Sequence, residues 1–180
     1  MRFLTDYERA LNGDKNLVAA DLEGANLRDA DLEGVDLSCS FLSEINLRNA
    51  DLTGAKLMRA DLRDADLRDA DLTGANLLDA DLTNADLRDA DLYDAKLCHA
   101  DLRNANLRGA NLSSADLWDA DLTNADFRKA NLGGYAILYG ANLTNADFRN
   151  AWLVSANLTD AKGLSSADFK NADLTDVKGL

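Results

Sequence analysis

The chain of 180 residues contains no proline, a single histidine, two cysteines and only 6% aromatic residues. Proline suits irregular loops because it fixes φ, so its absence indicates short, regular units with few such loops. The cysteines, Cys39 and Cys98, have neither the spacing of a zinc site nor that of a disulfide framework, which favours a reducing cytoplasm. No apolar run approaches the roughly 18 residues that would predict a membrane span.

The beginning of the chain and its overall charge exclude further classes. The segment MRFLTDYERALNG is charged throughout and lacks the apolar core of a signal peptide, so we expect a cytoplasmic protein. The formal net charge of −13 argues against direct binding to nucleic acid or to an anionic membrane, because a surface that follows phosphates must be positively charged.

Residues that could carry catalysis are also scarce. His99 follows Cys98 directly, and adjacent strand positions point to opposite sides, so the two do not form a nucleophile and its base. The sequence has no phosphate-binding loop, no zinc spacing and no G-x-G-x-D calcium pattern. We therefore predict no enzyme activity, no metal, no cofactor and no small-molecule substrate.

What the sequence does contain is a repeat of five residues. From residue 17 to residue 132 every fifth residue is Leu, except for Phe127. The residue two positions before each of these centres is usually Ala, and the one between is usually Asp or Asn, as in ADLRDADLRDADLTG from Ala60. A period of five fits neither a helix face nor a strand face. It fits a solenoid in which each unit forms one side of a coil, with Leu and Ala inside.

The A-(D/N)-L-x-x unit, repeated over nearly the whole chain from Leu17, resembles the pentapeptide repeat family. The resemblance implies an all-β fold, a right-handed quadrilateral β-helix or parallel β-solenoid with four units per coil. At the ~4.8 Å spacing of paired strands, about eight coils would form a rod roughly 40 Å long. In such a rod Cys39 and Cys98 lie three coils, ~14 Å, apart, too far for a disulfide.

The repeat has irregular places and a different beginning. One extra residue falls within Gly133–Tyr135, a second within Ala161–Leu164 and a third within Val177–Leu180, which we interpret as bulges that leave the coil phase intact. Thr5 and Glu8 fit a capping box and Gly13 fits a helix stop. We therefore expect a capping helix from about Asp6 to Asn12 within residues 1–14, and the β-helix over residues 15–180. The sequence shows no comparable cap after Leu180.

Sorting the residue after each centre by coil side gives one column made only of cations. This basic ladder consists of Arg28, Arg48, Arg68, Arg88, Arg108, Arg128, Arg149 and Lys170. Asp residues before the centres and in the next column would offset the mutual repulsion of the cations. The ladder is then either a solvated face or a linear site for a polyanion or an acidic protein segment. The centres that precede the last three cations of the ladder are Phe127, Phe148 and Phe169. They should stack on one another inside the core.

A second column is mostly apolar although its positions should face water. This apolar ridge consists of Val18, Met58, Leu78, Cys98, Trp118 and Tyr139, and is interrupted by Ser38 and ended by Thr159. A contiguous exposed apolar surface marks a contact site, and Trp and Tyr are enriched at interface hot spots. We therefore expect a protein partner or self-association at the ridge, the alternative being drift at tolerant positions.

The other two sides are acidic. One carries Asp31, Asp51, Asp71 and Asp91 with no basic column beside it, and one carboxylate per coil approximates the ~3.4 Å phosphate spacing along a DNA strand. The sequence thus leads to a non-catalytic protein-binding or scaffold module that acts through exposed faces. The alternative is an acidic DNA mimic that binds a type II topoisomerase such as DNA gyrase, as one branch of the resembled family does. That branch has many Phe centres, long projecting loops and a C-terminal dimerisation helix. Here the centres are mostly Leu, the insertions are single residues and the sequence shows no such helix.

Overall fold

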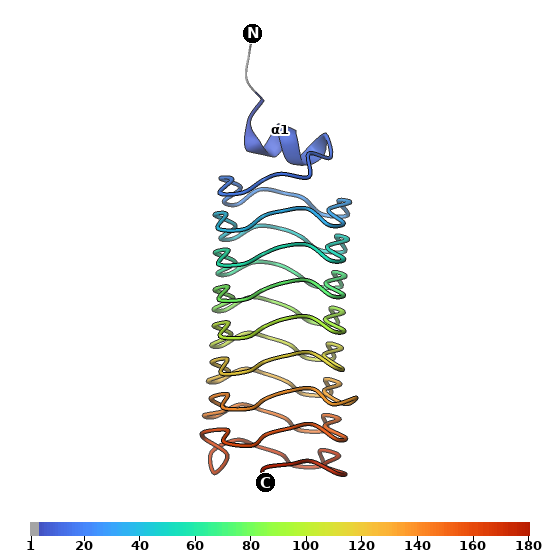
Figure 1. Cartoon of the computed structure of the whole chain (residues 1–180), viewed down its shortest axis with the longest axis vertical. Coiled ribbons are helices and arrows are strands. Elements are labelled where there is room, and N and C mark those ends of the chain that lie inside the picture. The colour runs from blue at the N-terminus through green and yellow to red at the C-terminus, as the bar shows by residue number, and fades with distance from the viewer. Residues whose placement is uncertain (1–3) are drawn as a thin grey trace.

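A computed structural model describes residues 4–180 as a stack of similar coils along one rod (Figure 1). Successive coils pair through isolated parallel β-bridges, and each bridge joins residues 20 or 21 positions apart, as in Asp61 to Asp81 and Asp81 to Asp101. Bridges recur every fifth residue, so each coil has four sides. Over residues 4–180 no strand is longer than these single bridges, and the α-helix is α1, Asp6–Leu11.

Backbone hydrogen bonds hold the coils together. Leu67 N–H donates to the carbonyl oxygen of Asp86 (2.8 Å), and Asp86 N–H donates back to that of Ala65 (2.9 Å). The same pair of bonds recurs at most units along the stack. Because a buried backbone group must be paired, this ladder enforces the 20-residue period.

Each side ends in a tight turn. Ala70 N–H donates to the Leu67 carbonyl oxygen (3.2 Å), and the intervening Asp69 has φ 58°. This is a type II β-turn, which requires positive φ at its third residue. Gly, Asn and Asp are the residues that tolerate this conformation best. They accordingly fill most of the fifth positions of the repeat, as Gly74, Asp79 and Asn84 do on three successive sides.

The Asp or Asn before each centre also has a structural task. Its side-chain oxygen accepts a hydrogen bond from the backbone N–H two residues later, as Asp71 Oδ1 does from Thr73 (2.9 Å) and Asn76 Oδ1 from Leu78 (3.2 Å). These are Asx-turns, which either side chain can form. Asp and Asn are therefore interchangeable for the fold, although they differ in charge.

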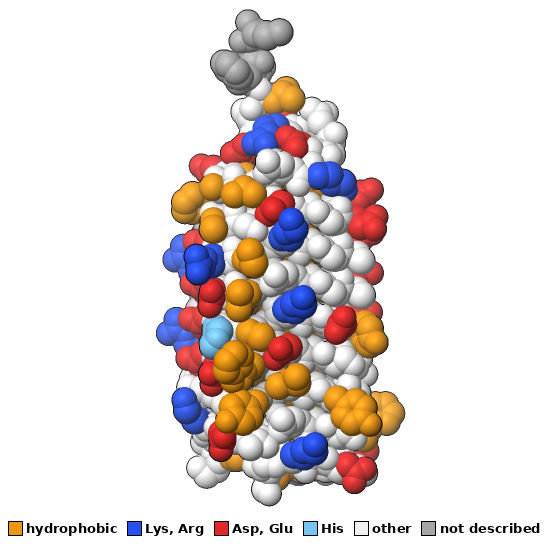
Figure 2. All heavy atoms as spheres, in the orientation of Figure 1, with side chains coloured by type: hydrophobic (Ala, Val, Ile, Leu, Met, Phe, Trp, Pro, Cys, Tyr) orange, Lys and Arg blue, Asp and Glu red, His pale blue; other side chains and the backbone are white. Residues whose placement is uncertain are grey.

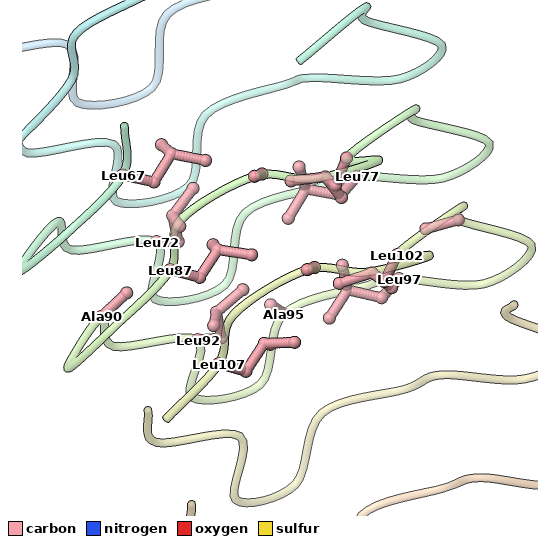
Figure 3. Packing of buried hydrophobic residues seen from close by; sticks show 14 of the residues in the cluster. Leu67, Leu72, Leu77, Leu87, Ala90, Leu92, Ala95, Leu97, Leu102 and Leu107 are labelled. Carbon is pink, nitrogen blue, oxygen red and sulfur yellow. The ribbon is translucent and has the colours of Figure 1, made fainter. Parts of the chain in front are cut away.

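The core is a continuous column of leucine and alanine. The centres from Leu17 to Leu158 are fully buried, and so are nearly all the alanines that precede them. Leucines of one coil lie over those of the next, as Leu67, Leu87 and Leu107 do in Figure 3. The expected aromatic stack is confirmed: Phe127 and Phe148 have ring centroids 4.8 Å apart, and Phe148 and Phe169 5.0 Å apart, with the rings nearly parallel.

The insertions fall where the sequence placed them. Bridges shift from 20 to 21 residues between Asn131 and Ile137, and again between Lys162 and Asp168. In the second insertion Gly163 takes the place of a centre with φ 74°, and a side chain there would meet the Thr144 backbone nitrogen at 2.5 Å. Lys178 still pairs in register with Asn157, and Gly179 (φ 88°) repeats the conformation of Gly163. The expected third irregularity is therefore confined to the last two residues.

The helix α1 begins with the expected capping box. Thr5 Oγ1 accepts from Glu8 N–H (3.1 Å), and the Glu8 carboxylate accepts from Thr5 N–H (2.9 Å). The helix ends at Leu11, one residue before the predicted end, with Asn12 as its C-cap. Asp6 accepts from Asp21 N–H (3.0 Å), and the Tyr7 hydroxyl donates to the Asn26 carbonyl oxygen (3.2 Å), so α1 is bonded to the first coil.

The stacked core makes the fold sensitive to a charge at any centre. We expect Leu67→Lys or Leu87→Lys to cost at least the about 2–5 kcal/mol of a buried Leu→Ala change, because an unpaired charge would enter the leucine column. Circular dichroism during heating measures the loss as a lowered Tm. Tyr93→Lys, on an exposed position beside Leu92, is the control. An unchanged Tm in both centre variants would contradict the core assignment.

Candidate functional site

The two predicted surface columns lie at corners of the coil. The residue after each centre is the second residue of a β-turn, so the apolar ridge and the basic ladder run along edges of the rod. Neither column contributes side chains to the core, and the turn fixes only the backbone of its members. These edges are therefore the places where the sequence can change without disturbing the coil.

The apolar ridge is exposed at its ends and half-buried in its middle. Val18, Trp118 and Tyr139 are 49, 44 and 39% exposed. Met58, Leu78 and Cys98 are half-buried, and Ser38 is buried. The expectation that every position faces water is thus too simple, because side chains stacked one coil apart cover part of each other. A line of hydrophobic side chains along one face of the rod is visible in Figure 2.

Charged residues flank the ridge. Arg59 Nε lies 3.4 Å from Asp79 Oδ2, and Lys56 Nζ lies 3.3 Å from Asp36 Oδ2. Beside them a shallow hollow of about 220 Å³ is lined by Met58, Leu78 and polar neighbours. An apolar strip bordered by charged side chains has the anatomy of a protein interface, with a hydrophobic centre and a polar rim.

Cys98 and His99 do not form a catalytic pair. The His99 ring packs against Trp118, with centroids 5.1 Å apart. Burial raises the pKa of the Cys98 thiol to about 11, and the nearby Asp116 carboxylate adds to the effect. At neutral pH the thiol is therefore protonated and is a poor nucleophile. Cys98 contributes to the ridge as a small apolar side chain.

Most of the basic ladder is neutralised by carboxylates. Arg68, Arg88, Arg128 and Arg149 each form an ion pair at 2.5–2.6 Å with the Asp two residues earlier. Several also approach the equivalent Asp of the next coil, as Arg128 does Asp147 at 3.6 Å. The hydrogen bond from Arg68 holds the pKa of the Asp66 carboxyl below its usual value, and Arg149 does the same to Asp147. Over most of its length the ladder is thus a network of ion pairs, each of them partly exposed.

The network is interrupted at Arg108, and the neighbouring column carries a second cation without a carboxylate, Lys129. Neither side chain forms an ion pair or a hydrogen bond within residues 4–180. Asn106 occupies the place of the usual Asp, and Gly109, Lys129 and Asn150 follow where earlier coils carry Asp69 and Asp89. The sequence analysis treated the ladder as uniform and missed this change. The signal that reveals it is the composition of the two columns that border the ladder.

A second feature missed from the sequence is a group of exposed aromatic residues near the first insertion. Tyr135, 76% exposed, occupies the inserted corner with φ 73°, and Trp152, 59% exposed, stands in a bridge column that otherwise carries Asp and Asn. Trp152 Nε1–H donates to Asp173 Oδ2 (3.0 Å), which fixes the ring against the rod. The sequence signal for this group is a tryptophan in a column whose other members are Asp or Asn.

Over residues 4–180 no three His, Cys, Asp or Glu side chains converge as metal ligands would. Within the same range no helix has the length and hydrophobicity needed to cross a membrane.

The raised pKa of Cys98 predicts a contrast between the two cysteines. At pH 8 iodoacetamide should modify the exposed Cys39 much faster than Cys98, because alkylation requires the thiolate. Peptide mapping by mass spectrometry at successive times gives both rates in one sample, so Cys39 is the internal control. Faster modification of Cys98 would mean that it is not buried in the ridge.

Comparisons with known proteins agree with the geometry. A model of the family described as pentapeptide repeats matches eight copies over residues 16–54, 25–64, 65–104, 105–134 and 136–178. Among solved structures, HetL, a pentapeptide repeat protein involved in heterocyst differentiation regulation from the cyanobacterium Nostoc, is 36% identical. The match covers 90% of this chain and 84% of HetL with a TM-score of 0.52.

QnrB1, a plasmid-mediated fluoroquinolone resistance protein, is 23% identical in one trypsin-treated form. That match covers 88% of this chain and 84% of QnrB1 with a TM-score of 0.52, and at this identity it bears on the fold alone. A search of curated proteins gives no match. The family match implies a right-handed β-helix, in agreement with the four-sided coil. This chain therefore belongs to the pentapeptide repeat family.

Proposed function

We propose that this chain is a non-catalytic, cytoplasmic protein-binding or scaffold module whose main contact surface is the apolar ridge. The observation that carries the proposal is the exposure of Trp118 and Tyr139 on adjacent coils of one edge, among other apolar side chains. In this proposal a rod of about eight coils, closed at its first coil by α1, holds the ridge rigid. The partner is another protein or a second copy of the chain.

The dimensions of the ridge suit a protein contact. Six coil spacings separate Val18 from Tyr139, a length of about 29 Å at ~4.8 Å per coil. A partner that also contacts the charged flanks would approach the roughly 800 Å² that each protein buries in an interface of standard size. Because each coil is bonded to the next, the ridge loses little conformational entropy when it binds.

The similarity to HetL supports a regulatory role. HetL is involved in regulating heterocyst differentiation. Cys98 and His99 are the neighbouring thiol and imidazole of this chain. The Cys98 thiol is protonated at neutral pH, and the His99 ring packs on Trp118. A regulatory role exerted through protein contacts fits both facts.

The ridge predicts a specific loss of association. The double variant Trp118→Ala, Tyr139→Ala should lower the affinity for the partner or second copy by at least about 30-fold, since truncation of a hot-spot residue costs about 2 kcal/mol or more. Light scattering over a range of concentrations measures self-association. Quantitative mass spectrometry of proteins captured from native lysate measures other partners.

The control for this test is the double variant Phe41→Ala, Tyr93→Ala, which removes exposed aromatic rings outside the ridge. It should keep both the mass and the captured proteins of the unchanged chain. Equal behaviour of the two double variants would show that the ridge is not the contact surface.

The second candidate function is an acidic DNA mimic that binds a type II topoisomerase such as DNA gyrase. It is favoured by the bridge column of Asp31, Asp51, Asp71 and Asp91, which stacks carboxylates on one side of the rod. The column then changes to Asn111, Asn131 and Trp152. Its carboxylates are also tied to their own turns, as Asp51 Oδ1 is to Thr53 N–H (2.9 Å). The acidic stretch is thus short, and we rank this function below the first.

A gyrase supercoiling assay separates the two functions. We expect the protein to leave supercoiling unchanged at concentrations at which the ridge binds its partner. If the protein inhibits, the variant Asp51→Asn, Asp71→Asn tests the cause, because Asn keeps the Asx-turn while removing the charge. Inhibition that disappears in this variant would replace the ridge proposal with mimicry.

A further inference from the structure

A series of adjoining hollows runs around one edge of the rod, away from the ridge. The first, about 190 Å³, lies among Arg108, Arg128, Lys129, Arg149 and Asn150. The next, about 270 Å³, shares Lys129 and Asn150 with it and reaches Trp152. A third, about 280 Å³, continues from Asn131 and Trp152 to Gly133 and Val154. Neighbouring hollows share lining residues, so the three adjoin one another, and we call this series the groove.

The first hollow is suited to an anion. It is lined by four cations and one amide and by no carboxylate side chain. Arg128 and Arg149 remain engaged with Asp126 and Asp147, but Arg108 and Lys129 have no partner within residues 4–180. An arginine fork and a lysine point charge side by side are the usual combination for binding phosphate oxygens.

The other end of the groove is suited to a planar ring. The Trp152 side chain is held by its hydrogen bond to Asp173, yet the residue is 59% exposed and borders hollows on two sides. A fixed, exposed indole is a platform on which a base can stack. Asn131, Asn150, Asn171 and Asp173 line the hollow beside it. Asn131 is engaged with Asn111 and Gly133, and Asn171 Nδ2 donates to Asn150 Oδ1 (3.4 Å). The Asn150 amide N–H groups and Asn171 Oδ1 remain for the polar edge of such a ring.

The two ends lie close together. Lys129 and Asn131 are two residues apart, which spans at most about 7 Å of chain, and Asn131 is bridged to Trp152 on the next coil. A phosphate group at Lys129 and a ring against Trp152 can therefore belong to one small molecule.

Charge limits the length of the ligand. Toward the N-terminal coils, the adjoining hollow is lined by Asp89 together with Arg88 and Arg108. Toward the C-terminal coils, the Asp168 carboxylate lies 3.6 Å from Arg149. A long polyanion would meet these carboxylates and the net charge of −13. The unpaired cations thus favour a ligand with a few negative charges.

We propose that this groove binds a nucleotide, with its phosphates between Arg108 and Lys129 and its base stacked on Trp152. The site is separate from the ridge and independent of the partner proposed above. It also departs from the sequence-based expectation of no small-molecule ligand. The shared chemistry is a phosphate joined to a planar base, whether in a free nucleotide or at the end of a single strand.

The test uses Trp152 as its own reporter. In a Trp118→Phe background Trp152 is the only tryptophan, and ADP should quench its fluorescence saturably. Arg108→Gln with Lys129→Gln should weaken the binding of ADP and of pyrophosphate at least tenfold. Trp152→Leu, followed by equilibrium dialysis with labelled ligand, should weaken ADP but not pyrophosphate. Arg28→Gln with Arg48→Gln, on the same ladder but outside the groove, is the matched control, and circular dichroism verifies that each variant is folded.

Each outcome decides for or against the site. Absence of saturable ADP binding at millimolar concentration, or equal loss in the groove and control variants, would overturn the proposal. Tighter binding of a hexaglutamate peptide than of ADP would overturn it in favour of an acidic protein segment. A 5′-phosphorylated oligonucleotide that binds as tightly as ADP would support the site and identify the ligand as a strand end, whereas weaker binding would identify a free nucleotide.

Discussion

The backbone hydrogen bonds between one coil and the next are the constraint from which the rest of the structure follows. Each bridge residue donates to the coil before it, and each centre donates to the coil after it, so every side must keep its position relative to residues about 20 further along. A side chain can enter the core only at the centre and at the preceding alanine. The tight turns at the corners then require positive φ at the fifth residue, which selects Gly, Asn and Asp.

This division of tasks explains where function can reside. Three of the five positions are occupied by core packing or by the Asx-turn, and a fourth by the conformation of the corner. The residue after each centre is the least restricted, and the apolar ridge and the basic ladder are both made of it. The groove at Trp152 differs, because there a tryptophan stands in a bridge column that otherwise carries Asp and Asn, and a neighbouring edge loses its carboxylates.

The fold was predictable because the sequence repeats one simple physical solution. The buried centres, the stacked Phe127, Phe148 and Phe169, both internal insertions and the capping box of α1 all follow from period and local chemistry. The candidate sites were less predictable. Ridge exposure depends on how neighbouring coils shield one another, as they do Met58 and Leu78 but not Trp118. That Arg108 lacks a carboxylate partner becomes evident only when the residues of the two neighbouring columns, Asn106 and Gly109, are compared with the Asp residues of other coils.

The two single-residue insertions have a further consequence. A perfectly periodic edge offers the same chemistry at every coil, so a ligand could move along it by one spacing at little cost in energy. Each extra residue is absorbed at a corner, as at Tyr135, and the columns beyond it keep their alignment. The insertion therefore makes one coil different from its neighbours while the other coils keep the regular repeat. Near that coil lie Tyr135, Trp152 and the two cations without a partner. A molecule bound there would be held at one position along the rod and could not shift by a coil.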